Sequence, residues 1–143
     1  MAVAIVDTGV LIAMADVDDH HHHTAMEIVG GMDRGELPTG RVTNYVLLET
    51  LNWIHARKRQ GTAVDLHHRL NQSGGFEIHH AAQADFAAAS ELFETYDGLA
   101  FGDATIVAYM QREGIDYLYS FDDDFDAVDG IRRLASPENP FDQ

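Results

Sequence analysis

Short apolar segments alternate with longer helical patterns along the whole sequence, and this order constrains the fold more than any other feature. The predicted strands are residues 2–6, 40–43, 76–79, 117–121 and 131–134. Predicted helices cover residues 10–15, 20–34, 44–59, 63–72, 81–96 and 103–112. Strands that alternate with helices in this way form a parallel sheet with helices on both faces. We therefore expect an α/β fold, a three-layer α/β/α sandwich around a central parallel sheet.

The length of the chain, its predicted helix caps and the prolines near its end predict one domain followed by a short tail. A chain of 143 residues can bury a single sizeable core. We expect Asn44 to cap the long third helix and Thr62 to cap the fourth. Residues 136–143 contain two prolines and read as a tail, so the predicted domain covers residues 1–135.

Cysteine and membrane signals are both absent from the sequence. With no cysteine, the chain can form neither a disulfide nor a thiolate metal site, which is typical of a cytoplasmic protein. No apolar run is long enough to cross a bilayer, and the apolar start lacks the basic region of a signal peptide. We expect a cytoplasmic protein without membrane contact.

The charge balance is the most unusual part of the composition. Asp and Glu number 24 against 9 Lys and Arg, which gives a net charge of −15, and Lys58 is the single lysine. The acids are spread along the whole chain, which favours a halophilic source whose molar salt screens their repulsion. An acidic mesophilic protein or a protein with a basic partner would show the same balance. Molar salt also weakens the usual argument that an acidic surface excludes nucleic acid.

Two acids follow predicted strands and so should lie at the carboxyl edge of the sheet, where ligands bind in such folds. Asp7 ends the first strand, although turn chemistry alone would explain an Asp there. Asp122 follows the strand at 117–121 and belongs to a run of three aspartates between Phe121 and Phe125. Such a run is usually solvated, but the two aromatic residues would anchor this one.

Two further acids lie on helices that the pattern predicts to be apolar. Glu49 shares a helix face with Tyr45 and Trp53, which suggests a partly buried carboxylate. A pair with Arg57 or Lys58, or a solvent-facing position, explains it equally well.

Asp103 opens a helix that is apolar nearly all round and is therefore expected to be buried. An acid in the first helical turn also suits the helix dipole, so capping alone would explain this residue.

The four acids predict a single site when they are taken together. Carboxylates that share a cavity repel one another, which raises their pKa values unless a cation neutralises them. Oxygen ligands without cysteine favour hard ions such as Mg²⁺ or Mn²⁺. These ions can activate water and stabilise the charge of a phosphodiester during hydrolysis.

Four motifs, in the right order, resemble those of the PIN-domain family and, within it, the VapC-type toxins of toxin–antitoxin pairs. They are Val6–Ile12 (VDTGVLI), Thr43–Glu49 (TNYVLLE), Leu99–Ala108 (LAFGDATIVA) and Leu118–Phe125 (LYSFDDDF), the last followed by Gly130–Leu134 (GIRRL). The third motif is the most specific. The match covers nearly the whole chain, with one departure at Gly9, where the family often has a polar residue.

The resemblance implies a Mg²⁺- or Mn²⁺-dependent endoribonuclease and assigns roles by position. Asp7 and Asp103 would be the main metal ligands, and Glu49 and Asp122 would complete the acidic pocket. The residues that would assist are Asp124, Thr8 and Ser120. RNA, with tRNA as one candidate, would be the substrate. The implied partners are a VapB-like antitoxin, whose arginine would enter the pocket, and a second copy of the chain in a homodimer.

The histidine run and the basic run each have a structural interpretation and a functional alternative. The run His20–His23 is interpreted as the polar start of a helix, with adventitious Zn²⁺ or Ni²⁺ binding as the alternative. The basic run Arg57–Arg59, with Arg69, suits a helix C-terminus, and the alternative is a phosphate contact that guides RNA.

Other functions fit the sequence less well. The Asp7-Thr8-Gly9 motif also occurs in aspartic proteases, but those need a mostly β chain. A phosphatase with an Asp nucleophile usually needs a second acid two residues on, and that position is Gly9. An inactive PIN-like module that binds RNA or a partner, and a housekeeping RNA-processing PIN nuclease, remain as alternatives.

Overall fold

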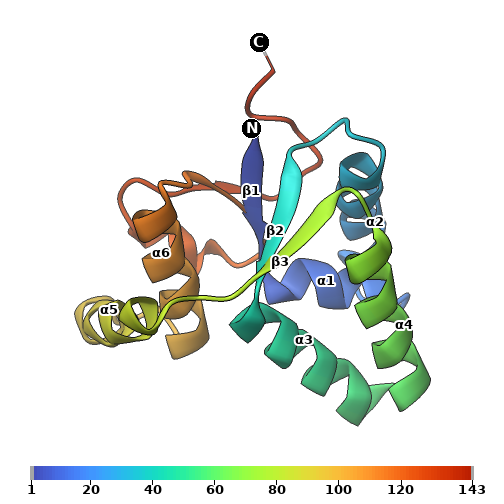
Figure 1. The fold of residues 1–143 in the computed structure, drawn as a ribbon, viewed down its shortest axis with the longest axis horizontal. Coiled ribbons are helices and arrows are strands. Elements are labelled where there is room, and N and C mark those ends of the chain that lie inside the picture. The colour runs from blue at the N-terminus through green and yellow to red at the C-terminus, as the bar shows by residue number, and fades with distance from the viewer. Residues whose placement is uncertain (1, 143) are drawn as a thin grey trace.

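A computed structural model describes residues 2–142 and contains one five-stranded sheet (Figure 1). The strands are β1 (Val3–Val6), β2 (Thr39–Thr43), β3 (Phe76–His79), β4 (Tyr117–Tyr119) and β5 (Arg132–Leu134). All neighbouring strands are parallel, and their order across the sheet is β3-β2-β1-β4-β5. The prediction of a central parallel sheet is therefore confirmed.

Six α-helices flank this sheet. They are α1 (Thr8–Ala15), α2 (His22–Asp33), α3 (Asn44–Arg57), α4 (Gln60–Gln72), α5 (Gln83–Thr95) and α6 (Phe101–Glu113). A short 3₁₀ helix, η1 (Asp123–Ala127), connects β4 to β5. In Figure 1, α5 and α6 lie on one side of the sheet, and α2 and α4 lie on the other. The architecture is the predicted three-layer α/β/α sandwich. None of the helices in the described part of the chain combines the length and apolar character that a membrane span requires.

The strand order creates a crevice at one edge of the sheet. The chain runs outward from β1 through β2 to β3, then returns across the sheet to β4 and β5. Because connections between parallel strands are right-handed, the helices change sides where this direction reverses. The reversal lies between β1 and β4, and ligands bind outside the carboxyl ends of strands at such a point. Asp7 directly follows β1 and Ser120 directly follows β4, so the fold brings these distant residues together.

Helix α6 holds the innermost position among the helices. Every residue from Ala104 to Met110 is buried, as its nearly uniform apolar sequence predicts. On the sheet side, Ala4, Ile5 and Val6 of β1 have no exposed surface. Burial of apolar surface is the dominant favourable term in folding, so α6 and β1 both contribute to the core that stabilises the fold.

Two predicted helix caps are wrong. Helix α3 is capped by Thr43, whose hydroxyl accepts a hydrogen bond from the Val46 backbone N–H at 3.2 Å. Thr43 ends β2 with an extended backbone, which is the conformation that an N-cap needs. The Asn44 side chain instead accepts from the backbone N–H of Ala81 at 2.8 Å. Helix α4 begins at Gln60, before Thr62, and has no side-chain cap.

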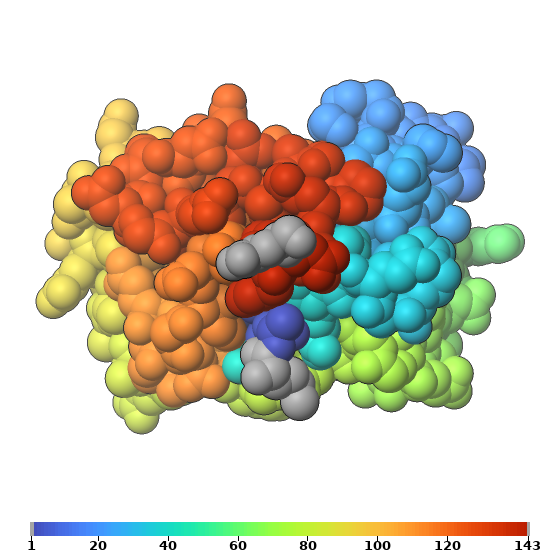
Figure 2. All heavy atoms as spheres, turned by 90° about the horizontal axis from the view of Figure 1, so that it is seen from above, coloured from blue at the N-terminus to red at the C-terminus, as the bar shows by residue number. Residues whose placement is uncertain are grey.

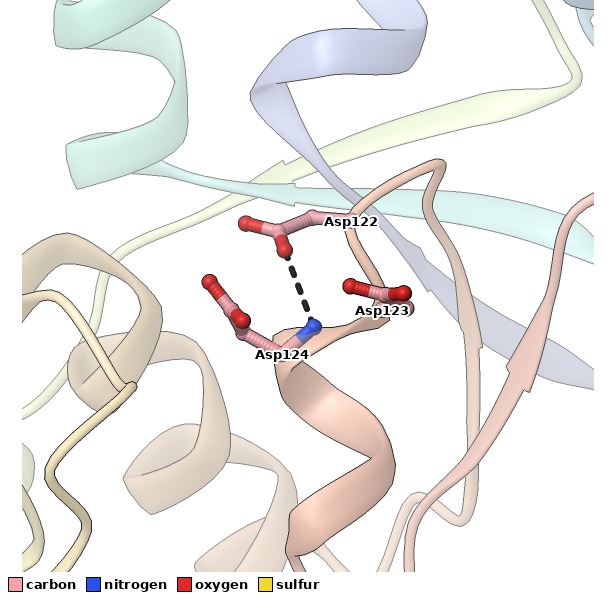
Figure 3. Close-up of side chains that lie close together, drawn as sticks. All are labelled: Asp122, Asp123 and Asp124. Carbon is pink, nitrogen blue, oxygen red and sulfur yellow. Dashed lines mark hydrogen bonds between the residues drawn. The ribbon is translucent and has the colours of Figure 1, made fainter.

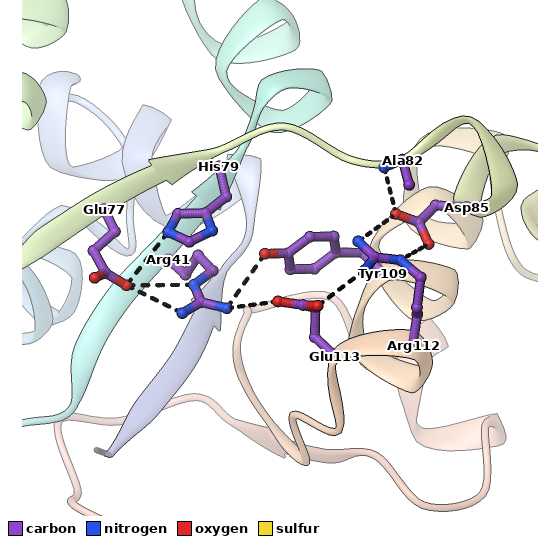
Figure 4. A network of polar contacts seen from close by, with 8 residues as sticks. All are labelled: Arg41, Glu77, His79, Ala82, Asp85, Tyr109, Arg112 and Glu113. Atoms are coloured by element: carbon purple, nitrogen blue, oxygen red, sulfur yellow. Dashed lines mark hydrogen bonds and ion pairs between the residues drawn. The ribbon is translucent and has the colours of Figure 1, made fainter.

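A polar network ties the two helices α5 and α6 to the sheet (Figure 4). Arg41 of β2 forms ion pairs with Glu77 of β3 at 3.3 Å and with Glu113 of α6 at 3.2 Å. Buried Asp85 accepts two hydrogen bonds from Arg112, at 2.7 and 3.0 Å. Arg112 therefore holds the pKa of Asp85 below its usual range. This acid is a structural one, because its charge is balanced within the protein.

The residues that follow β5 pack against the amino-terminal ends of the strands. In Figure 2 they lie beside the start of β1. The Tyr119 hydroxyl donates to the Glu138 carbonyl at 2.6 Å, and Asn139 donates to the Glu36 carbonyl at 3.0 Å. This predicted tail therefore lies at the edge of the sheet opposite the one where Asp7 is found.

Candidate active site

A pocket of about 380 Å³ opens at the carboxyl edge of the sheet, beside the crevice between β1 and β4. Nine residues line it: Asp7, Thr8, Gly9, Asp19, His21, Glu49, Asp103, Phe121 and Asp122. The four acids predicted to form the core of the site are thus on the wall of one pocket. They come from four different segments, namely the end of β1, helix α3, helix α6 and the loop after β4.

Asp7 is the most firmly held of these acids. It lies between β1 and α1 as the N-cap of α1, and its Oδ1 accepts from the Thr8 backbone N–H at 2.8 Å. Its Oδ2 accepts from the Ser120 hydroxyl at 2.7 Å. The pKa of Asp7 is raised to about 6, chiefly by burial and to a smaller extent by the charges of Asp122 and Glu49, while these two hydrogen bonds oppose the rise. Asp7 is therefore positioned by turn chemistry and also faces other carboxylates.

Asp103 lies in the first turn of α6 and is half-buried. Its carboxylate accepts no hydrogen bond within residues 2–142, and Ala100 occupies the N-cap position, so capping does not explain it. The pKa of Asp103 is raised to about 7, chiefly by burial and then, in decreasing order, by the charges of Asp7, Asp122, Glu49 and Asp124. The negative charges of all four of these acids therefore act on the carboxylate of Asp103.

Glu49 reaches the pocket from an exposed position, so the prediction of a partly buried carboxylate is wrong. Its Oε2 accepts from the Thr8 hydroxyl at 3.2 Å. Its Oε1 lies so close to the Gly102 backbone that a Cβ atom there would be 2.6 Å away.

The basic residues that could have paired with Glu49 have other contacts. Lys58 binds Asp16 at 2.9 Å, and Arg57 lies over the Trp53 ring. Arg69, the outlying member of the basic cluster, pairs with Asp33. These contacts support the structural interpretation of the cluster and leave Glu49 directed toward the other acids.

The three consecutive aspartates after β4 have different positions (Figure 3). Asp122 caps η1, with its Oδ1 accepting from the Asp124 backbone N–H at 2.9 Å, and its own N–H donates to Ser120 Oγ at 3.0 Å. Asp122 lines the pocket, whereas Asp123 and Asp124 are exposed. Asp124 still stands near enough to raise the pKa of Asp103, and the Asp122 charge raises the pKa of Asp124 itself.

Within residues 2–142, this run is the one group of three acids whose carboxylate oxygens all come within 4.8 Å of one another. The pocket acids Asp7, Glu49 and Asp103 are spaced more widely. Asp122 belongs to both sets and therefore joins the compact run to the wider pocket.

The pocket has the chemistry of a hard-cation site. None of Asp7, Glu49, Asp103 and Asp122 forms an ion pair with a basic side chain in the described part of the chain, in contrast to Asp85. Buried carboxylates that lack a basic partner are costly unless they bind a cation or take up protons. All the donor atoms are oxygens, the ligands that Mg²⁺ and Mn²⁺ prefer. The residues therefore fit a divalent ion.

Several pocket residues were not predicted from the sequence. Gly102 lies inside the third motif, but only the structure shows that its missing side chain makes room for Glu49. Asp19 and His21 lie between α1 and α2, and His21 was interpreted only as part of a helix start. The helix begins one residue later, at His22. At Gly9, where a polar residue was expected, an added Cβ would meet nothing within 4 Å.

Comparisons with known proteins agree with the fold. Residues 4–131 match the family model of the PIN domain. A search of curated protein sequences gave no match. The VapC20 toxin of Mycobacterium tuberculosis, described as cleaving the sarcin-ricin loop, has 27% sequence identity and a TM-score of 0.75. That similarity covers 88% of this chain and 94% of the toxin.

Two complexes share the fold at lower identity. VapBC2 of Rickettsia felis, solved with a DNA fragment from its promoter, has a TM-score of 0.71 and 12% identity over 92% of this chain and 97% of that one. A toxin–antitoxin complex from Klebsiella pneumoniae has a TM-score of 0.64 and 19% identity, covering 95% and 98%.

A three-layer sandwich with a carboxylate pocket at its topological switch point defines the class of PIN-domain proteins. The chain belongs to the PIN-domain family, since the family model matches most of its length. Within that family its structure is of the VapC type. VapC homologues are nucleases, and this supports the prediction that the chain is a hydrolase.

Proposed function

We propose that this protein is a metal-dependent endoribonuclease that hydrolyses RNA phosphodiester bonds and acts as the toxin of a VapBC-type pair. One observation carries the proposal: Asp7, Glu49, Asp103 and Asp122 line a single pocket without a basic partner among the described residues. The similarity to VapC20, a toxin described as cleaving the sarcin-ricin loop, supports RNA as the substrate. We keep tRNA as a second candidate.

The four acids have separate roles in this proposal. Asp7 and Asp103 are the main ligands of Mg²⁺ or Mn²⁺, because burial raises the pKa of both carboxyl groups and neither has a basic partner among the described residues. Glu49 and Asp122 complete the ligand set, and Asp124 assists from the exposed side. When bound, the ion supplies an activated water and stabilises the negative charge of the phosphodiester during hydrolysis.

The surrounding groups orient these ligands before any ion binds. Thr8 and Ser120 donate to opposite oxygens of Asp7, which fixes the plane of its carboxylate. The Thr8 hydroxyl also donates to Glu49, so one residue contacts acids from two elements. Such outer contacts usually change metal affinity or activity by 10–100-fold when they are removed.

Asp7→Asn tests the enzymatic proposal, because it keeps the shape of the side chain and removes one ligand charge. Single-turnover cleavage of total tRNA and of a structured ribosomal RNA fragment is measured in Mg²⁺ or Mn²⁺ at molar KCl. We expect cleavage by the wild type, at least a 100-fold loss in Asp7→Asn, and no loss in Asp129→Asn, an exposed acid outside the pocket. Equal cleavage by wild type and Asp7→Asn, or none by the wild type in either metal, overturns the proposal and leaves an inactive binding module.

The partner of the proposed toxin is a VapB-like antitoxin whose arginine enters the acidic pocket. A guanidinium binds carboxylates in a bidentate manner, and the pocket offers several acids without a basic partner among the described residues. A small open reading frame beside the gene is the candidate source. Suppression of RNA cleavage by its product, and loss of suppression when its arginine is replaced, distinguishes a toxin from a housekeeping nuclease.

A homodimer is proposed on the basis of an exposed apolar surface. Its members are Tyr45, Leu48, Phe86, Phe93 and Phe101, from α3, α5 and α6, and we call it the aromatic patch. Leu48 is 59% exposed, and Phe86 and Phe93 are each 48% exposed. Contiguous exposed apolar side chains mark interaction surfaces in soluble proteins.

We also propose a cytoplasmic location and a halophilic source, on the basis of the missing cysteines and the net charge of −15.

A further inference from the structure

One histidine stands among the acids of the pocket. Of the nine lining residues that the structure describes, His21 is the only one whose side chain carries nitrogen, and five of the others are Asp or Glu. The Thr8 hydroxyl already donates to Glu49. His21 is therefore the one side chain on this wall with an N–H to offer to an anion.

Stacking holds the His21 ring in place. It lies parallel to the Phe121 ring, with centroids 4.2 Å apart and an angle of 9° between the planes. The His20 ring approaches it to 4.0 Å with a tilt of 41°. Centroids this close require contact through the ring faces, so the nitrogen-bearing edge of His21 is the part left for a ligand. Within residues 2–142, its ring nitrogens form neither a hydrogen bond nor an ion pair.

The segment that carries His21 is also held by its backbone. The His21 N–H donates to Asp19 Oδ1 at 2.8 Å, and the next residue, His22, makes a 2.7 Å hydrogen bond from its ring to the Ala13 carbonyl. At the start of the same loop, Asp16 is paired with Lys58 at 2.9 Å. The His21 ring is thus placed in advance, which lowers the entropy lost when a ligand binds.

An RNA substrate creates a need for such a group. In the proposed function the cation would bind the phosphate to be cleaved, but the neighbouring phosphates would meet a wall of carboxylates and a chain with net charge −15. A neutral imidazole has one N–H donor, and a hydrogen bond to a charged acceptor is stronger than one between neutral groups. An N–H on the rim of the pocket can therefore hold a phosphate oxygen that no other side chain there would attract.

We propose that His21 is a substrate-positioning residue, whose ring N–H donates to a phosphate oxygen of the RNA next to the cleaved bond while Phe121 holds the ring by stacking. This inference rests on the proposed ribonuclease function. It gives a role to one member of the run His20–His23, whereas the proposed metal site uses none of these histidines.

Two substitutions separate the N–H from the ring. His21→Phe keeps a ring to stack on Phe121 and removes the donor, and His21→Gln keeps an N–H donor and removes the ring. We expect His21→Phe and His21→Ala to raise KM about tenfold with kcat within about twofold, and His21→Gln to recover part of the loss. His23→Ala is the matched control, because this exposed neighbour pairs with Glu27 at 2.8 Å and does not line the pocket.

A binding measurement separates this inference from the proposed function. The Kd of a fluorescent RNA oligonucleotide is measured with Mg²⁺ for the same variants, each combined with Asp7→Asn so that the RNA is bound without being hydrolysed. We expect the Kd to rise about tenfold for His21→Phe and to stay at the wild-type value for His23→Ala. If the wild type binds this RNA without cleaving any RNA, the enzymatic proposal fails and the binding ratios still decide the role of His21.

The role of His21 would be overturned by wild-type KM and Kd values for His21→Phe, by an equal effect of His23→Ala, or by no binding of the oligonucleotide by the wild type. A tenfold fall in kcat with KM unchanged would also contradict it, because a positioning contact to a flanking phosphate acts on binding.

Discussion

The hydroxyl of Ser120 donates a hydrogen bond to Asp7 Oδ2 at 2.7 Å, although 113 positions separate the two residues in the sequence. Ser120 is fully buried and also accepts from the Asp122 backbone N–H at 3.0 Å. A single hydroxyl therefore joins the acid that follows β1 to the acid that follows β4. It lowers the pKa of Asp7, in opposition to the burial that raises it.

Ser120→Ala should weaken the site without unfolding the protein. We expect a 10–100-fold loss of Mn²⁺ affinity and of RNA cleavage, since Asp7 loses the contact that fixes its second oxygen. Stability should fall by about 1–2 kcal/mol, because the Asp122 N–H loses its acceptor. Calorimetric titration with Mn²⁺ measures the affinity, and Ser90→Ala on α5 serves as the control. Unchanged Mn²⁺ affinity in Ser120→Ala would show that the hydroxyl does not position Asp7.

Gly102→Ala should separate activity from stability. The new Cβ would lie 2.6 Å from Glu49 Oε1, and the flexible end of that side chain can move away at little cost. Alanine is also the better helix former by up to about 1 kcal/mol. We therefore expect an unchanged or higher Tm and a cleavage rate at least tenfold lower.

The matched test of Gly102→Ala uses the Glu49→Ala background. If the glycine acts through Glu49, adding Gly102→Ala to Glu49→Ala should cause no further loss of cleavage. A further tenfold loss in the double variant would show that Gly102 acts on another part of the site.

Stability without divalent ions should fall as pH rises. The carboxyl pKa rises from 3.8 to about 7 for Asp103 and to about 6 for Asp7, so the folded state binds protons more tightly than the unfolded state. The free energy of unfolding should therefore decrease from about pH 4 to about pH 7. Because the pocket is open to solvent, we expect the two groups to contribute about 1–2 kcal/mol.

Binding of Mn²⁺ and removal of the Asp103 charge should both reverse this loss of stability. With EDTA at pH 8, Asp103→Asn should be more stable than the wild type, and Mn²⁺ should raise the Tm of the wild type much more at pH 8 than at pH 5. Thermal melts across this pH range measure both effects. Asp129→Asn provides the control, and a Tm of Asp103→Asn below that of the wild type at pH 8 would contradict the electrostatic explanation.

The aromatic patch should control the oligomeric state. Phe86 and Phe93 lie 5.2 and 5.4 Å from the Phe101 ring, measured between centroids, and both are about half exposed. We expect the wild type to be a dimer by light scattering and Phe93→Asp to be a folded monomer, because a charge would be buried at the interface. Met26→Asp, at a similarly exposed apolar residue on α2, should remain a dimer. A monomeric wild type would show that the patch has another partner.

The sequence was sufficient to predict the layers of the fold, since strand and helix periodicities differ and alternate cleanly. The sequence was less informative where two neighbouring residues could cap the same helix with similar energies. Thr43 and Asn44 are both good N-caps, and the one that already had an extended backbone at the end of β2 took the role. The start of α4 was placed too late because it lacks a side-chain cap altogether.

The members of the pocket were predictable where they belong to motifs, and their environments were not. The apolar neighbours of Glu49 suggest a partly buried carboxylate, with a solvent-facing position as the alternative, and in the structure the residue is exposed at the mouth of the pocket. His21 and Gly102 gave no usable signal, because a stacking contact and a missing side chain depend on segments far away in the sequence. Local patterns cannot report such contacts.

The long sequence separation between Asp7 and Ser120 also has a consequence for synthesis. The ribosome makes Asp7 early and Ser120 113 residues later, so a growing chain carries the first acid for most of its translation without the hydroxyl that orients it. Contacts between such distant residues also carry a cost in chain entropy, because the long segment between them must first be brought together. An incomplete chain of the proposed nuclease would therefore lack an assembled site, and the time available for the proposed partner to meet that site begins only when the last strands are in place.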